Sequence, residues 1–347
     1  MFSQINPMHD LLVLGIESTC DETACALVRN GQEILSNVVV SQGDLHAVYG
    51  GVFPELACRR HIDLFPTVIQ RALTEAGATF ADVDLIAVAK EPGLLGALLV
   101  GLNMAKGLSM GLDKPLIGVN HVEAHLYAAM MSQKELVFPA LGVVISGGHT
   151  FIAKMHSISS YEIIGTTVDD AIGEAFDKVA RMLGLPYPGG PSVEKAALVG
   201  DPWKYPFKGG VVKTNPWHFS FSGLKTSVLY ALQGQDGLKK MDLPKEEMAH
   251  IAASFQRAAF SSIVEKAIKA VEAFSLKAIY FGGGVSGNLA LRKKFAESGM
   301  SIPLFWPEHF LTADNAAMIA GLGYHKYKNK GRSPLEISPK TRMIYTQ

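Results

Sequence analysis

The chain has 347 residues, of which 48% are hydrophobic, with 32 basic and 32 acidic side chains. This apolar content is enough for a sizeable buried core and excludes an intrinsically disordered protein. Because the charges balance, no overall field attracts a polyanion, and any nucleic-acid surface must be local. Three cysteines (Cys20, Cys25 and Cys58) form no CxxC pair, which indicates structural thiols in a reducing compartment.

The sequence predicts a soluble, cytoplasmic protein with no membrane partner. The opening "MFSQINPMHD" lacks the basic and apolar regions of a signal peptide. The most apolar run, "GLLGALLVGLNMA", is interrupted by glycine and followed by Lys106. It is shorter than the roughly 20 residues that a membrane-spanning helix needs.

The first half of the chain alternates predicted strands and helices. Residues 11–16 and 23–28 are apolar, strand-like runs joined by the polar turn "ESTCDE". The periodicity further predicts an amphipathic helix over 61–77, a buried strand over 83–93, a buried helix over 94–112 and a strand over 115–120.

The second half opens on a hairpin of the same design. Residues 140–145 and 150–155 flank the turn "SGGH", which indicates a weak internal repeat. Helices are expected over 169–185, 251–274, 289–299 and 314–327, with a strand entering a glycine-rich turn over 277–288. The alternation of strands and helices predicts an α/β fold. The stretch 186–222 is rich in Pro, Gly and Trp, a composition typical of a functional loop or an insertion.

The stretch "NHVEAHLYAA" places His121 and His125 four residues apart on a predicted helix. Residues i and i+4 project from one helix face, so the two imidazoles could supply two metal ligands. The alternative is two histidines with separate structural roles. A metalloprotease is excluded, because Glu123 does not follow the first histidine directly and points away from that face.

Asp314 in "TADNAAM" is a candidate third ligand, with capping of the following helix as its alternative role. Two histidines and one aspartate leave coordination positions open for a substrate.

Two glycine-rich turns, residues 146–150 and 282–288, follow predicted strands. Glycines there let backbone N–H groups approach an anion or a planar ring. Neither turn matches a dinucleotide or P-loop motif. Together with the acidic hairpin tip of Glu17, Asp21 and Glu22, they indicate a nucleotide site that uses a cation or a general base.

Seven segments together resemble the tRNA N6-adenosine threonylcarbamoyltransferases, a family once described as O-sialoglycoprotein endopeptidases. The resemblance runs from about residue 11 to 325 and is of the bacterial type. The segments are "GIESTCDET", "HVEAHLYA", "ISGGHT", "DDAIGEAFDKVARMLGLPYPGGP", "FSFSGLKT", "FGGGVSGN" and "DNAAMIA".

The resemblance implies an actin/Hsp70/sugar-kinase-like (ASKHA) fold with two ribonuclease-H-like lobes around a nucleotide cleft. We expect the lobes at 1–118 and 119–347, with the last helix, from about 314, packing back on the first. The implied reaction transfers threonylcarbamoyl from threonylcarbamoyl-AMP to N6 of the adenosine just 3′ of the anticodon in tRNAs that read ANN codons.

The resemblance also implies site residues, a metal and partners. Glu22 is the implied catalytic residue, and the metal is iron(II), with zinc(II) as the alternative. The implied partners are tRNA, an inactive paralogue of the same fold and a P-loop ATPase. The implied metal ligands are His121, His125 and Asp314, and the implied substrate-binding positions are Val144, Ile145, Ser146, Gly147, Gly148, Asp177, Gly190 and Asn288.

Two other classes remain open on the sequence: an actin-like ATPase or small-molecule kinase of the same fold, and a binding protein with a decayed site. A basic C-terminal stretch is a candidate tRNA surface, with a solvated tail as its alternative. From Tyr324 to Gln347 it has six Lys or Arg residues and one Glu, a net charge of +5.

Overall fold

The computed structural model describes residues 10–49, 51–233 and 244–342. They form two compact units: one runs up to Ser132 and resumes at Asp314, and the other runs from Gln133 to Ala313. The boundary therefore differs from the expected one at residue 118. The reason is α4 (His121–Ala128), which packs against α10 (Ala316–Lys330) within the first unit.

The first unit contains a mixed sheet with the strand order β3-β2-β1-β4-β5. The pairs β1–β2 and β2–β3 are antiparallel, whereas β4 and β5 add in parallel. The strands are β1 (Leu12–Glu17), β2 (Glu22–Arg29), β3 (Glu33–Ser41), β4 (Leu85–Glu91) and β5 (Leu116–Asn120).

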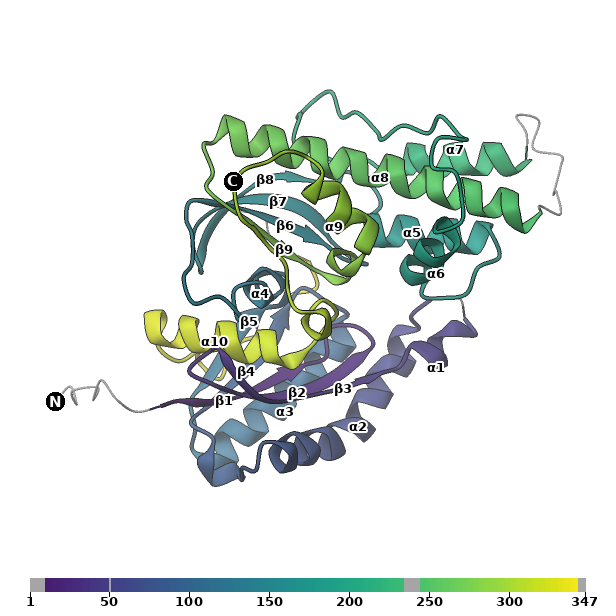
Figure 1. Ribbon diagram of the computed structural model, residues 1–347. Helices are drawn as coiled ribbons and strands as arrows, with labels where there is room; N and C mark the ends of the chain where they lie inside the picture. The colour runs from purple at the N-terminus through teal and green to yellow at the C-terminus, as the bar shows by residue number, and fades with distance from the viewer. Residues whose placement is uncertain (1–9, 50, 234–243, 343–347) are drawn as a thin grey trace. The chain divides into compact units, whose positions relative to one another are not determined.

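Helices cover both faces of this sheet (Figure 1). The helix α10 lies on one face, and α2 and α3 lie on the other. Gly15 of β1 allows the close approach of α10, because a Cβ there would lie 2.3 Å from the Ala316 carbonyl oxygen. The helices are α1 (Gly43–Ala47), α2 (Pro54–Glu75), α3 (Leu95–Leu112), α4 and α10, with a short 3-10 turn at Phe80–Asp82.

Among the described helices, α3 is long and apolar enough, by length and composition, to cross a membrane. The apolar run alone is too short to span a membrane, but the helix that contains it has 18 residues, so length does not exclude a membrane span. Its contacts with β4 and α2 bury Leu98, Leu102 and Ala105 on one side, but only 33% of the helix is buried, so the expectation of a buried helix is wrong for its outer face.

The second unit repeats the design of the first. Its strand order β10-β9-β6-β7-β8 is the same topology, with antiparallel β6–β7 and β7–β8 and parallel β9 and β10. The predicted pair of similar hairpins, β1–β2 and β6–β7, is thus confirmed. The strands are β6 (Ala140–Ile145), β7 (Thr150–Ser157), β8 (Ser160–Thr166), β9 (Ile279–Gly282) and β10 (Leu304–Phe305).

The core of the second unit lies between this sheet and its helices. Side chains of β6 and β9, such as Val143 and Phe281, join Phe176 of α5 and Phe255 of α8 in one apolar cluster. The helices are α5 (Ile172–Met182), α6 (Gly189–Ala197), α7 (Ser222–Gln233), α8 (Lys245–Ala273) and α9 (Leu289–Ala296), with 3-10 turns at Gly284–Gly287 and His309–Leu311.

The basic C-terminal stretch is described as far as residue 342, and two of its backbone N–H groups contact strands of the first sheet. Ser333 N–H donates to the Leu116 carbonyl at 2.7 Å, and Lys340 N–H donates to the Lys90 carbonyl at 3.0 Å. Ile337 packs against the core of the unit. Most of residues 331–342 are exposed, so their side chains are solvated as the alternative predicts, but the backbone is held at Ser333 and Lys340; residues 343–347 lie outside the described part.

Candidate metal site and substrate-binding loops

The helix α4 starts at His121 because Asn120 caps it. The Asn120 side chain accepts hydrogen bonds from the backbone N–H groups of Val122 and Glu123. Both histidines are buried, and their ring centroids lie 4.6 Å apart. Glu123 lies off this face and forms an ion pair with Lys326, as expected for a structural carboxylate.

Asp314 lies next to both histidines. Its Oδ1 is 3.1 Å from His125 Nε2 and 3.4 Å from His121 Nε2. The alternative role, capping of α10, belongs instead to Asn315, whose side chain accepts from Met318 N–H. The carboxylate of Asp314 therefore contacts the two histidines and does not cap α10.

These three residues fit a metal ion. One ligand atom from each lies within 4.8 Å of the others. Two ligand atoms of a tetrahedral ion with bonds of about 2.05 Å lie roughly 3.3 Å apart, close to the spacings at Asp314. Within the described part of the chain, Nδ1 of the buried His125 forms no hydrogen bond, and its Nε2 has only the contact with Asp314. Buried polar groups are rarely left unsatisfied, and a metal ion would satisfy this imidazole.

The ionisable side chains of the site shift one another's pKa values. Burial acts to lower the pKa of His121, but the Glu17 and Asp314 carboxylates outweigh it and hold that pKa well above its ordinary value. Burial dominates at His125 and lowers its pKa. Burial likewise acts to raise the pKa of Asp314, but His121 and His125 hold it well below its usual range. The metal-free cluster therefore favours an ionised Asp314 and a protonated His121, whose proton a cation could replace.

Glu22 begins β2, and its carboxylate accepts a hydrogen bond from Ser41 Oγ at 3.2 Å. Burial and the negative charges of Asp314 and Asp21 raise the pKa of Glu22 well above its ordinary value. Such a carboxyl can exchange a proton nearer to neutral pH than an exposed glutamate.

The end of β6 and the turn after it carry five of the implied substrate-binding positions. Val144 and Ile145 are buried strand residues, so they can offer only backbone groups. Ser146 N–H already donates to the His149 carbonyl at 2.8 Å, which corrects the expectation that this N–H is free for an anion. Gly147 and Gly148 are exposed, and their N–H groups form no backbone hydrogen bond among the described residues.

The other three positions lie at helices of the same unit. Asp177 of α5 accepts a hydrogen bond from Gly189 N–H at 2.7 Å, and a Cβ at Gly189 would lie 2.5 Å from the Asp177 Cα. Gly190 has open space where a Cβ would lie. The Asn288 side chain caps α9 through Ala290 N–H and Leu291 N–H, so it has a structural role of its own.

A cavity of about 720 Å³ lies in the second unit. Pro191 and Leu289, which follow Gly190 and Asn288 in the sequence, form part of its lining. Its walls include Pro191 and Glu194 from α6, Gln256 from α8 and Leu289 from α9. Most of the cavity surface is apolar, and its lining also includes several charged side chains, among them Glu194, Arg257 and Lys293.

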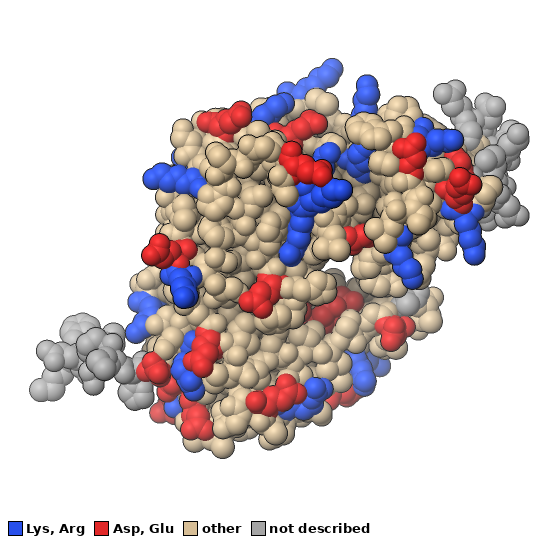
Figure 2. All heavy atoms as spheres, in the orientation of Figure 1, with Lys and Arg blue, Asp and Glu red and all other residues tan. Residues whose placement is uncertain are grey.

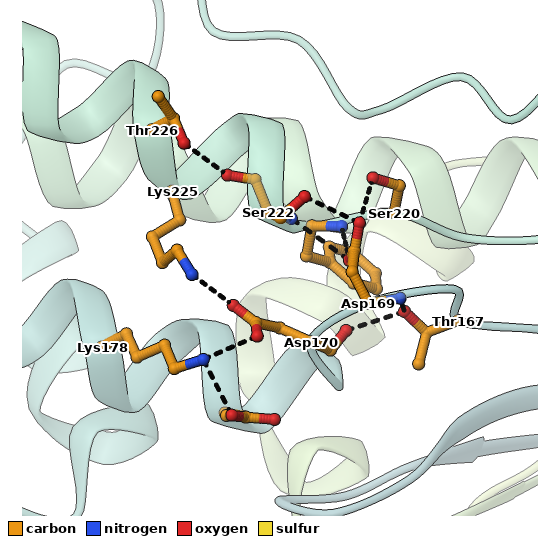
Figure 3. Close-up of polar contacts among 10 residues, drawn as sticks. Thr167, Asp169, Asp170, Lys178, Ser220, Ser222, Lys225 and Thr226 are labelled. Carbon is orange, nitrogen blue, oxygen red and sulfur yellow. Dashed lines mark hydrogen bonds and ion pairs between the residues drawn. The ribbon is translucent and has the colours of Figure 1, made fainter.

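A carboxylate clamp, formed by Asp169 and Asp170, lies just before α5 (Figure 3). Asp169 accepts hydrogen bonds from the hydroxyls of Ser220 and Ser222 and from the backbone N–H groups of Phe221 and Ser222. Asp170 pairs with Lys178 and Lys225. These contacts tie the start of α7 to α5, whose Gly173 N–H donates to the Ser146 carbonyl.

Replacing Asp169 with alanine is expected to lower the free energy of unfolding by about 1–3 kcal/mol, since several hydrogen bonds to a partly exposed carboxylate are lost. Burial acts to raise the pKa of Asp169, but these hydrogen bonds lower it. Its stabilising effect is therefore complete above its unfolded-state pKa and disappears as the pH falls through its folded-state pKa. Denaturant unfolding from acid to neutral pH checks both points. A parent and an Asp169→Asn variant with parallel pH profiles would contradict the account.

Sequence reasoning missed two groups. Glu17 was interpreted only as part of an acidic tip, although it contacts His121. The clamp residues Asp169, Ser220 and Ser222 lie too far apart in sequence to suggest contact. A usable signal was the pair of neighbouring acids, Asp169 and Asp170, just before a helix.

Known proteins resemble this chain over nearly its whole length. A family model described as tRNA N6-adenosine threonylcarbamoyltransferase matches residues 33–321. A protein of that name from Protochlamydia amoebophila is 58% identical over 335 residues, covering 96% of this chain and 98% of the relative. One from Chlamydia muridarum is 51% identical over 335 residues, covering 96% and 97%.

Solved structures share the fold at low sequence identity. HypF from T. kodakarensis aligns with a TM-score of 0.61 and 16% identity, covering 92% of this chain and 48% of HypF, so the chain spans about half of that protein. Component A of the Acidaminococcus fermentans (R)-2-hydroxyglutaryl-CoA dehydratase aligns with a TM-score of 0.51 and 16% identity, covering 92% and 99%. The expected ASKHA fold is confirmed.

Proposed function

Because this chain belongs to the tRNA N6-adenosine threonylcarbamoyltransferase family and so forms N6-threonylcarbamoyladenosine in tRNA, we propose how its residues carry out the transfer. The family assignment favours a transferase over the two alternatives, an ATPase or kinase and a decayed binding protein. The proposed donor is threonylcarbamoyl-AMP, and the proposed acceptor is the adenosine just 3′ of the anticodon in tRNAs that read ANN codons.

The observation that carries the proposal is the buried cluster of His121, His125 and Asp314. These residues hold one divalent metal ion, iron(II) in our proposal and zinc(II) as the alternative, since two histidines and one carboxylate suit either ion. When bound, the metal supplies positive charge that stabilises donor oxygens as negative charge develops. Elemental analysis of the purified protein distinguishes iron from zinc.

The acceptor amine is a poor nucleophile, because its lone pair is delocalised into the adenine ring. Glu22 accepts the amine proton in our proposal, and its raised pKa supports this role. The mixed anhydride of the donor supplies a good leaving group, so positioning of the two reactants dominates the rate gain. Alignment of this kind can contribute roughly 7–11 kcal/mol.

The second unit binds the nucleotide part of the donor in our proposal. The exposed N–H groups of Gly147 and Gly148 hold the phosphate or the carbamoyl oxygen, as backbone amides in glycine turns do. Asp177 binds the ribose. The adenine enters the cavity between α6, α8 and α9, with the backbone around Asn288 at its edge.

The partner proposals follow the family: a paralogue of the same fold, a P-loop ATPase and a cytoplasmic location. An exposed apolar group on the first unit supports protein docking. Val48, Tyr49 and Phe53 are 80%, 62% and 48% exposed, and the two rings contact each other. Transfer assays with labelled threonine, bicarbonate, ATP, tRNA and the synthase that makes the donor, with each candidate partner added in turn, test which partners are required. Product in the absence of tRNA, or ATP turnover alone, would contradict the assignment.

The tRNA surface must be local, because acidic and basic side chains are interspersed over the face in Figure 2. The C-terminal stretch remains our proposal, with one revision from the structure. Lys326 is committed to Glu123, whereas Lys328 and Lys330 are exposed or partly exposed at the end of α10.

Reversing the charge of Lys328 and Lys330 with glutamate is therefore expected to raise the apparent KM for tRNA several-fold and to reduce its salt dependence. The KM for the donor should not change. Steady-state kinetics at several salt concentrations check this, with Lys269→Glu on α8, an exposed lysine outside the cavity, as a control of equal charge per site. If the double variant keeps the parent KM and salt slope, tRNA binds elsewhere, and the basic stretch from Lys204 to Lys225 becomes the next candidate.

A further inference from the structure

Glu17, the last residue of β1, has a fully buried carboxylate with both oxygens engaged. Its Oε2 lies 2.9 Å from His121 Nδ1. Its Oε1 accepts the backbone N–H of Thr19 at 2.6 Å. The resemblance gives this residue no role, and the proposed transfer chemistry does not use it.

A buried carboxylate is costly unless it is paired, so its retention here needs a reason. The contact with His121 supplies one. A carboxylate oxygen accepts hydrogen bonds, so this 2.9 Å contact is made when His121 Nδ1 donates. The lone pair of Nε2 then faces Asp314 when the ring is neutral. Hydrogen bonding to a carboxylate is also how many metal-binding histidines are oriented and made more basic.

The two histidines differ in this respect. His125 Nδ1 has no hydrogen-bond partner among the described residues, whereas His121 Nδ1 has Glu17 and lies 3.3 Å from Thr19 Oγ1. Both rings contact Asp314 through Nε2, but only His121 also has a carboxylate at Nδ1. The same carboxylate holds Thr19 N–H, so it also fixes the turn that leads to Asp21 and Glu22.

We propose that Glu17 is a positioning residue for the metal site. It fixes His121 with Nδ1 protonated and Nε2 presented to the ion, and it couples this imidazole to the acidic turn of the first hairpin. Glu17 acts through His121 and touches neither substrate. The inference rests on the metal site proposed above.

The direct test is the affinity of the full chain for Zn²⁺, measured by competition with a chromophoric chelator. Glu17→Gln keeps the shape of the side chain but removes its charge, and it should weaken binding about 10- to 100-fold, as loss of such partners does elsewhere. The matched control is Thr19→Val, which removes the hydroxyl near His121 Nδ1 but keeps the backbone N–H to Glu17. It should stay within about 3-fold of the parent, since the carboxylate contact remains.

Comparing these variants with His125→Ala tests the role of Glu17 separately from the metal site itself. If His125→Ala loses Zn²⁺ and folded Glu17→Gln binds it like the parent, the role of Glu17 is wrong and the site stands. If both variants bind like the parent, the site is wrong as well. A Thr19→Val variant as weak as Glu17→Gln would assign the effect to the hydroxyl.

A second measurement needs no Glu17 variant, in case Glu17→Gln does not fold. In the zinc-loaded parent labelled with ¹⁵N-histidine, the His121 ring should show a protonated Nδ1, protected from exchange, and a metal-bound Nε2. Loss of the signals in His121→Asn assigns them. Metal bound through Nδ1, with the proton on Nε2, would overturn the proposal.

Discussion

Replacing His125 with alanine is expected to weaken metal binding more than about 100-fold, beyond the usual loss from removing an outer partner, and to abolish transfer. His125 is buried, its Nδ1 forms no hydrogen bond within the described chain, and its Nε2 contacts Asp314, itself a proposed ligand, so the variant loses a ligand and only a contact inside the site. The metal-free fold should therefore survive. His121→Ala should lose metal and transfer as well.

Glu123→Gln is the matched control on the same helix. Glu123 lies between the two histidines in sequence but pairs with Lys326, away from their shared face. It should keep the metal and the activity of the parent. Elemental analysis and transfer kinetics on the purified variants provide the measurements. A His125→Ala protein with full metal content and full activity would refute the ligand assignment.

Replacing Glu22 with glutamine is expected to lower the transfer rate about 10²- to 10⁴-fold at saturating donor, the usual loss when a general base is removed. Donor binding should change little, because glutamine can still accept the hydrogen bond from Ser41. The pH profile gives a second sign. Since burial and neighbouring carboxylates raise the pKa of Glu22, the parent rate should rise with pH through that raised pKa, and the variant should lack this limb.

Asp21 is the residue that could replace Glu22 as the base, so Asp21→Asn is the necessary comparison. It should keep most of the rate if Glu22 is the base. Single-turnover rates with preloaded donor separate chemistry from binding. A Glu22→Gln enzyme with parental turnover, paired with a slow Asp21→Asn enzyme, would transfer the role to Asp21.

Much of the fold could be predicted from the sequence, because the central strands and helices are strongly patterned. The apolar runs at 11–16, 115–120 and 140–145 became buried strands. The strands β3 and β8 were missed, since each lies at a sheet edge and buries only part of its side chains. Their mixed polarity does not show the pattern of a buried strand.

The candidate site could be predicted only in part, for a related reason. His121 and His125 are visible because helix geometry links residues four apart. The contacts of His121 with Glu17 and of Asp169 with Ser220 join segments distant in sequence, so tertiary packing alone creates them. The reassignment of the helix cap from Asp314 to Asn315 also depends on backbone geometry at a single residue.

The central claim is that a metal held by His121, His125 and Asp314 is required for threonylcarbamoyl transfer to tRNA. The most direct measurement is product formation from synthetic threonylcarbamoyl-AMP and unmodified tRNA, with partner subunits present, followed by mass spectrometry of the tRNA nucleosides. We expect N6-threonylcarbamoyladenosine with the parent, none after the chain is stripped by a chelator, and recovery when iron(II) or zinc(II) is restored. Parental product levels from a stripped chain, shown to be metal-free by elemental analysis, would contradict the account.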